Sequence, residues 1–114
     1  MRTVIFDLFD PTELKASMKR AIATGVPDVP RISFVSTEDM LKALGGRRTE
    51  MLKALAGAGP VGIRELARRL DRDARAVHAD AHTLIEYGVL DKHDDGKVEF
   101  PYDAVHVDFM VFAA

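Results

Sequence analysis

Three side chains that can hydrogen-bond to DNA recur on one stretch of the chain. Arg75, His78 and His82 are three and four residues apart, which is the spacing of one face of an α-helix. An arginine guanidinium can donate two hydrogen bonds to guanine in the major groove. The pattern predicts a helix over residues 74–87 whose outer face contacts double-stranded DNA, with Arg72 just before it as a further contact.

Histidines four residues apart on a helix also chelate zinc, so His78 and His82 have a second interpretation. Asp80 or Glu86 would have to complete the ligand set, but Asp80 is expected to point partly inward and the chain has no cysteine. The other two histidines are expected on a hairpin and on a strand, away from this helix. We therefore expect no metal site and no cofactor.

The sequence lacks the motifs that indicate catalysis. It has no cysteine nucleophile, no Gly-x-Ser-x-Gly elbow, no phosphate-binding glycine loop and no metalloprotease histidine pair with an intervening Glu. The adjacent acids Asp94 and Asp95 fall in an expected turn, where solvation is sufficient to explain them. We expect that the protein is not an enzyme.

The elements that would position the basic residues form a helix-turn-helix. Apolar residues recur every three or four positions in residues 63–70 and again in residues 74–87, so each helix has one apolar stripe. The small residues Ala67 and Ala81 would let the two helices cross closely. Gly88 is expected to end the second helix.

A short β-hairpin is expected to follow. Residues 89–93 and 97–100 flank Asp94, Asp95 and Gly96, and an Asp-Gly pair supplies the positive φ angles of a tight turn. This hairpin corresponds to the wing of a winged helix-turn-helix. Its acidic tip repels phosphate, so the candidate contacts on it are Lys92, His93 and Lys97.

Positive charge is concentrated where the helix-turn-helix is predicted. The whole chain has 16 Lys and Arg against 18 Asp and Glu, a formal net charge of -2. Residues 47–75 nevertheless contain eight basic and four acidic side chains, whereas residues 76–114 contain two and eight. This distribution gives the expected DNA-binding segment a modest positive field, although a solvated helical face is the alternative interpretation.

The basic segment supplies the remaining expected phosphate contacts. Arg64 lies near the start of the first helix of the pair, and Arg47 and Arg48 lie before it. Arg69 follows Glu65 by four residues, so we expect these two to pair with each other. The predicted DNA contacts are Arg47, Arg48, Arg64, Arg72, Arg75, His78, His82, Lys92 and Lys97.

The first 46 residues predict a strand, a helix, a strand and a short helix. The first helix is expected to start at Pro11 with Asp10 as its N-cap and to end at Gly25, and Ser36 resembles the cap of the next, which ends near Gly45. A further helix is expected over residues 47–56. The apolar face of the first helix consists of Leu14, Met18, Ala21 and Ile22. This face either packs in the core or lines a ligand pocket, and we favour the core.

The last segment is unusually apolar. Residues 105–112 alternate at first and then become apolar on both faces, as the first strand does around Ile5 and Phe6. We hypothesise that the two terminal strands join one sheet whose exposed face or edge is covered by another subunit, giving a homodimer. The alternative is that these strands pack inside a monomer.

Length and composition predict one compact unit, and the order of the expected elements predicts an α+β fold with three parts. Residues 1–46 and 101–114 are expected to mediate dimerisation, and residues 47–100 to form the DNA-binding core. No segment is apolar enough to span a membrane and the N-terminus does not resemble a signal peptide. With no cysteine in the chain, we expect a cytoplasmic protein.

From about Ile32 onward the chain resembles a family of small archaeal and bacterial winged-helix regulators related to the MarR and ArsR types. The resemblance rests on residues 32–34, Ser36 with its acidic helix start, residues 47–48 before 51–55, residues 59–60 and 63–67, residues 77–78 with Asp80, and residues 100–103. It implies transcriptional regulation, and some members resemble antitoxins that repress their own operon. Relatives usually have a basic residue where this chain has Ala79, so weaker DNA contact is expected.

These features together predict a sequence-specific transcriptional regulator, with repression as the expected output. The helix of residues 74–87 would lie in the major groove, and a homodimer would contact a roughly palindromic site. The alternative is an antitoxin or protein-interaction module that binds a neighbour-encoded protein, such as a toxin, through its terminal strands.

Overall fold

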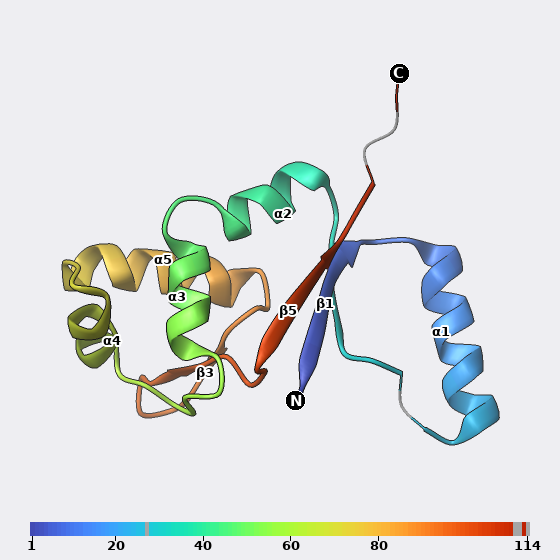
Figure 1. Ribbon diagram of the computed structural model, residues 1–114, viewed down its shortest axis with the longest axis horizontal. Helices are drawn as coiled ribbons and strands as arrows, with labels where there is room; N and C mark the ends of the chain where they lie inside the picture. The colour runs from blue at the N-terminus through green and yellow to red at the C-terminus, as the bar shows by residue number, and fades with distance from the viewer. Residues whose placement is uncertain (27, 111–112, 114) are drawn as a thin grey trace.

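A computed structural model describes residues 1–26, 28–110 and 113 of the chain. Within these residues helices and strands mix along the sequence, which confirms the predicted α+β class (Figure 1). The elements in chain order are β1 (Thr3–Leu8), α1 (Pro11–Thr24), β2 (Arg31–Phe34), α2 (Thr37–Leu44), α3 (Arg48–Leu55), α4 (Ile63–Leu70), α5 (Ala74–Glu86), β3 (Asp91–Lys92), β4 (Val98–Glu99) and β5 (Ala104–Asp108).

The two terminal strands join one sheet, as the sequence analysis predicted, and the structure adds that they are direct neighbours and parallel. The strand order is β2-β1-β5, with Phe6 of β1 opposite Ile32 on one side and Val107 on the other. Among the described residues, no strand pairs with the second side of β5. The final apolar residues that the sequence analysis assigned to this strand, 111 and 112, lie outside the described residues.

One face of the sheet packs on the helices. Val4 and Phe6 of β1 are fully buried, and the Phe6 and Phe34 rings meet edge to face with centroids 5.4 Å apart. Phe34 also contacts Tyr87 at the end of α5, with centroids 5.8 Å apart. Aromatic packing therefore joins the sheet to the helical part of the molecule.

Helix α1 begins and ends as predicted but does not pack in the core. Asp10 accepts a hydrogen bond from the Thr12 amide at 2.9 Å, and Gly25 ends the helix with a φ of 70°. No residue of α1, which the structure describes throughout, is buried, and Ile22 is 81% exposed. Figure 1 shows this helix on the far side of the sheet from α3, α4 and α5.

The predicted core packing of the apolar face of α1 was therefore wrong. Leu14 borders an open cleft of about 760 Å³ beside the sheet, and Met18 is exposed like Ile22. Amphipathic spacing identifies an apolar stripe but not the surface that covers it, which explains the error.

Polar contacts hold α1 against the connector that follows it. Ser17 donates a 2.5 Å hydrogen bond to Asp28, and Arg20 lies 3.1 Å from the same carboxylate. The hydrogen bond from Ser17, followed by those from the Val29 amide and Arg20, lowers the pKa of Asp28 to about 2. This carboxylate is therefore ionised over the whole neutral and mildly acidic range.

The remaining helices form one cluster around buried residues of α3, α4 and α5. Ser36 caps α2 by accepting from the Asp39 amide at 3.1 Å, as predicted. Gly88 adopts a φ of 77° directly after Tyr87, the C-cap of α5, which confirms that it terminates this helix. The apolar residues that fill the cluster are Met51, Leu52, Leu55, Leu66, Ala67, Val77, Ala81 and Leu84.

Strands β3 and β4 form the expected antiparallel hairpin. The Gly96 amide donates to the His93 carbonyl at 2.9 Å across the turn, and Gly96 has a φ of 87°. Asp95 does not share the positive φ that an Asp-Gly pair was expected to supply, so the turn has three residues with glycine last. Reciprocal backbone bonds of 2.8 and 2.9 Å join Val61 to Val98 and tie the hairpin to the segment before α4.

None of the helices in the described part of the chain combines the length and the apolar character needed to cross a membrane.

Candidate functional site

Helices α4 and α5 are joined by a tight turn whose geometry is set by two aspartates. Asp71 adopts a left-handed conformation with a φ of 51°, and its amide donates to the Arg68 carbonyl at 3.2 Å. Asp73 then caps α5 by accepting from the Ala76 amide at 3.3 Å. The buried small residues Ala67 and Ala81 allow close approach of the two helices, as the sequence analysis expected.

The outer face of α5 is open to solvent over its length. Arg75, His78, Ala79 and His82 are all exposed. The two imidazole rings are parallel, with centroids 6.5 Å apart, and His82 Nε2 lies 3.0 Å from Glu86 Oε1. The helical spacing therefore brings the predicted groove-facing side chains together on one surface.

A shallow groove separates this face of α5 from the hairpin. His78 and His82 line it from α5, Lys92 and Gly96 from the hairpin, and Ile63 from the start of α4. The groove has a volume of only about 40 Å³. It is therefore a narrow gap between packed elements and too small for a ligand cavity. The structure thus places Lys92 beside the two histidines.

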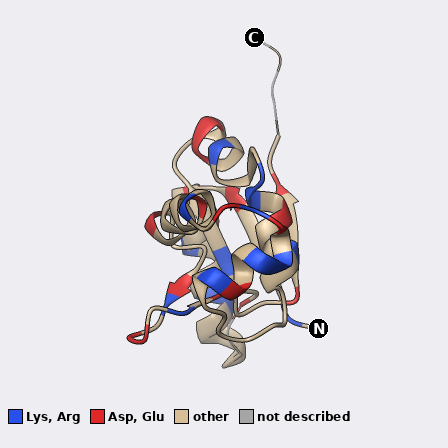
Figure 2. Ribbon diagram, turned by 90° about the vertical axis from the view of Figure 1, so that its left-hand side faces the viewer, with Lys and Arg blue, Asp and Glu red and all other residues tan. Residues whose placement is uncertain are grey.

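The hairpin carries charges of both signs. Lys97 is exposed, and its amide is held by a 3.0 Å hydrogen bond to Asp95 Oδ1. His93 lies 3.0 Å from Glu99 through its Nε2 atom and is partly buried. Figure 2 shows the acidic tip of the hairpin projecting from the molecule at the lower left.

The first turn of α4 presents an exposed basic side chain. Arg64 is exposed and adjacent to Ile63, which lines the groove. The neighbouring acid, Glu65, is 3.1 Å from Arg69 and also pairs with Arg68. The predicted pairing of Arg69 with Glu65 is confirmed. This pairing partly neutralises Glu65, the acidic residue in the first turn of α4.

Two arginines predicted to contact DNA instead face inward. Arg48 Nη1 lies 3.1 Å from Asp80 Oδ1, and Arg72 Nη1 lies 2.8 Å from Asp80 Oδ2. The side chain of Asp80 is 17% exposed and that of Arg72 only 10%. Arg48 Nε also donates to the Lys42 carbonyl at 2.9 Å. The outward orientation expected of Arg48 and Arg72 is therefore corrected, because a largely buried carboxylate attracts both guanidinium groups.

Asp80 is the residue whose role the sequence analysis missed. Its partners come from α3 and from the turn before α5, 32 and 8 residues away along the chain. The helical spacing indicated that Asp80 points partly inward from α5. Because a buried carboxylate needs basic partners, this orientation could have predicted its pairing with arginines. The three side chains connect α5 to the rest of the helical cluster.

Arg47 and the histidine pair complete the account of the predicted contacts. Arg47 is exposed at the start of α3 and lies 3.4 Å from Glu50. It is not among the residues that line the groove beside α5. Within the described residues, no group of three or more His, Asp or Glu side chains is arranged to hold a metal ion.

The fold and this surface define a mixed α+β protein with an exposed helix face bordered by a hairpin. A model of the HVO_A0114 family matches residues 43–107, more than half of the chain. The chain therefore belongs to the HVO_A0114 family. The match runs from the end of α2 through β5 and leaves out β1, α1 and β2. A comparison with curated proteins found no match.

Proposed function

We propose that the protein is a winged helix-turn-helix DNA-binding regulator of the MarR and ArsR type, acting in the cytoplasm as a repressor. The observation that carries this proposal is the open outer face of α5, where Arg75, His78 and His82 project together beside Lys92 of the hairpin. The segment of residues 47–75, with eight basic against four acidic side chains, supports the same interpretation through its outward basic residues, since Arg48 and Arg72 turn inward to Asp80.

The proposed complex has α5 in the major groove. Arg75, near the start of the helix, contacts a base edge, where a bidentate arginine contributes roughly 1–3 kcal/mol of discrimination between bases. Arg64 on α4 and Lys97 on the hairpin contact the phosphate backbone, with Arg47 as a more distant contact. Arg48 and Arg72 instead support α5 through Asp80.

Two features limit the proposed affinity. Ala79 provides no charge in the middle of the exposed face, and Asp94 and Asp95 repel phosphate at the hairpin tip. Tight binding then requires two copies of the chain on a roughly palindromic site, with half-sites about one helical turn apart. Repression follows because the bound dimer would block access of RNA polymerase to the promoter.

Fluorescence anisotropy tests this proposal with labelled duplexes of about 30 base pairs. One duplex carries the promoter of the protein's own gene and the other carries the same bases in scrambled order, and both are measured over a series of salt concentrations around 0.1 M. We expect Arg75→Ala to weaken binding to the promoter roughly 5- to 150-fold, which corresponds to the 1–3 kcal/mol of one base contact. Preference for the promoter over the scrambled duplex should fall by the same factor.

A phosphate contact has a different signature. Arg64→Ala should weaken binding to both duplexes equally and reduce the slope of log affinity against log salt by about one. Lys19→Ala removes the same charge from α1, where Lys19 is exposed, and should change neither quantity. The groove assignment is wrong if Arg75→Ala behaves like Lys19→Ala.

The exposed stripe of α1 favours a second candidate function, an antitoxin that binds a neighbour-encoded protein. Leu14, Met18 and Ile22, spaced four residues apart on one helix, place three large apolar side chains in solvent, and exposed apolar side chains on one helix face are typical of an interaction site. Co-expression with the neighbour-encoded protein tests this function. Co-purification that is lost in an Ile22→Glu variant, with DNA binding unchanged, would favour the antitoxin.

A further inference from the structure

Strand β5 ends the three-stranded sheet with one side open. The Ile5 amide donates to the Pro30 carbonyl at 2.9 Å, on the β2 side of β1. Successive residues of a strand direct their backbone groups to opposite sides, so Val4 and Phe6 bond toward β5. Their register partners there are Val105 and Val107.

The open side of β5 follows from the rules of a parallel ladder. A bonded residue pairs with the two residues that flank its register partner, so Val4 and Phe6 bond to residues 104, 106 and 108 of β5. Val105 and Val107 then direct their own N–H and C=O groups to the free side of the strand. Within the described part of the chain, nothing else pairs with that side.

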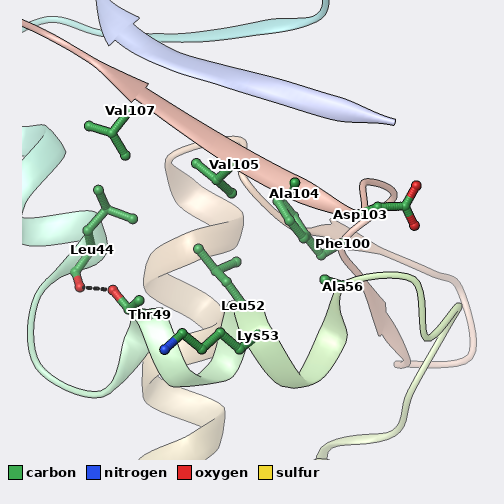
Figure 3. Close-up of a pocket in the computed structure, with 10 residues that line it drawn as sticks. All are labelled: Leu44, Thr49, Leu52, Lys53, Ala56, Phe100, Asp103, Ala104, Val105 and Val107. Atoms are coloured by element: carbon green, nitrogen blue, oxygen red, sulfur yellow. Dashed lines mark hydrogen bonds between the residues drawn. The ribbon is translucent and has the colours of Figure 1, made fainter. Parts of the chain in front are cut away.

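An apolar groove of about 300 Å³ runs along this open edge. Val105 and Val107 point into it from β5, toward Leu44 and Leu52 of the helical part (Figure 3). Val107 is 41% exposed although it faces these apolar side chains. The edge therefore presents unpaired backbone groups directly above an unfilled apolar surface, which is the arrangement that accepts an added strand.

We propose that the added strand is β5 of a second copy, paired antiparallel about a two-fold axis at His106. In this register Val105 of each chain lies opposite Val107 of the other, and His106 lies opposite His106. Both edge valines of each chain then exchange N–H···O=C bonds with the valine opposite, which makes four bonds in all. The two sheets become one sheet of six strands.

The pattern of β5 is self-complementary, which is why the proposal names a second copy as the occupant. Val105 and Val107 face the groove in each chain. The pairing therefore places two valine pairs on the apolar side of the joined sheet, and each chain adds its valines to the apolar surface beside the other chain's groove. Ala104 lies opposite Asp108, so the pairing brings no like charges together. The inference rests on the proposed function only in that a palindromic DNA site requires a two-fold dimer.

Single-cysteine variants test the register, because the natural chain has no cysteine. Residues 104, 106 and 108 occupy non-hydrogen-bonded positions, where paired Cα atoms lie about 4.5 Å apart, within the range of a disulfide. We expect His106→Cys to form a covalent dimer on mild oxidation. Ala104→Cys should cross-link when mixed with Asp108→Cys and not alone. Cross-linking of His106→Cys with Asp108→Cys instead would overturn the register.

Light scattering during size exclusion tests the interface without any cysteine. The natural chain should elute at twice its 12.6 kDa mass, and Val107→Lys should elute as a folded monomer, because an edge lysine blocks strand pairing. Val35→Lys is the matched control, since Val35 is 87% exposed just after β2 at the other edge of the sheet. It should remain dimeric.

The possible outcomes separate this proposal from the proposed function. A natural chain that is monomeric at micromolar concentration, or a dimer broken by Val35→Lys and not by Val107→Lys, would overturn the β5 interface. Circular dichroism confirms that each variant is folded. These measurements contain no DNA, so the Arg75→Ala binding experiment can succeed or fail independently of them.

Discussion

Asp80→Ala is the substitution with the largest expected effect on stability outside the apolar core. The carboxylate lies 3.1 Å from Arg48 and 2.8 Å from Arg72, and its side chain is 17% exposed. Its removal leaves two guanidinium groups together in a largely buried site without the charge that compensates them.

The size of the effect follows from this degree of burial. Breaking a fully buried ion pair costs about 3–5 kcal/mol, whereas an exposed pair contributes about 0–1 kcal/mol. Asp80 lies between these limits, and Arg48 keeps a backbone carbonyl partner at 2.9 Å. We therefore expect a loss of about 2–3 kcal/mol in the free energy of unfolding. For a domain of this size, that loss lowers Tm by about 8–12 °C.

Urea unfolding followed by circular dichroism measures this loss. Asp94→Ala, at the exposed hairpin tip, is the matched control and should change the free energy of unfolding by less than about 0.5 kcal/mol. The double variant Asp80→Ala with Arg72→Met should be more stable than the sum of the single effects predicts, because it removes one of the stranded charges. If Asp80→Ala is as stable as Asp94→Ala, the ion pairs of Asp80 with Arg48 and Arg72 do not hold α5 in place.

Three further predictions concern α1 and the helix ends. Ser17→Ala removes the leading cause of the low pKa of Asp28, so carboxyl NMR should find that pKa raised from about 2 toward 3.8. Because a lowered pKa stabilises the folded state above the unfolded value, the natural chain should lose this contribution as the pH falls from about 4 toward 2, and a flat stability curve there would contradict it. Met18→Gln should leave the free energy of unfolding within about 0.5 kcal/mol of the natural value, since Met18 is exposed, and a loss of 2 kcal/mol would mean that α1 is packed. Gly88→Ala should cost about 1–2 kcal/mol in urea unfolding because of its φ of 77°, whereas Gly62→Ala, at a φ of -71°, should cost little.

Local features of the fold could be predicted from the sequence because short-range chemistry determines them. Asp10, Ser36 and Gly88 mark helix ends through hydrogen bonds or backbone angles that involve only their neighbours. The pairing of Arg69 with Glu65 is equally local, because one turn of helix brings the two side chains together.

Features that depend on distant partners could not be predicted in the same way. The sequence indicated an apolar stripe on α1, but the stripe itself does not specify whether the sheet, another chain or solvent faces it. Arg48 was assigned to DNA because its partner Asp80 is 32 residues away. In the candidate site, exposure of Arg75, His78 and His82 follows from helical spacing. The inward orientation of Arg72 depends on how the turn before α5 folds back toward Asp80, and that of Arg48 on how α3 and α5 pack.

The pairing of β1 with β5 has a consequence for the route by which the chain folds. The Arg2 amide bonds to Asp103 at 2.7 Å across 101 residues of sequence, so the sheet depends on contacts of very high sequence separation. Closing so long a loop is entropically costly until α3, α4 and α5 have collapsed and shortened it. During synthesis β1 must therefore wait, unpaired on that side, until β5 has emerged.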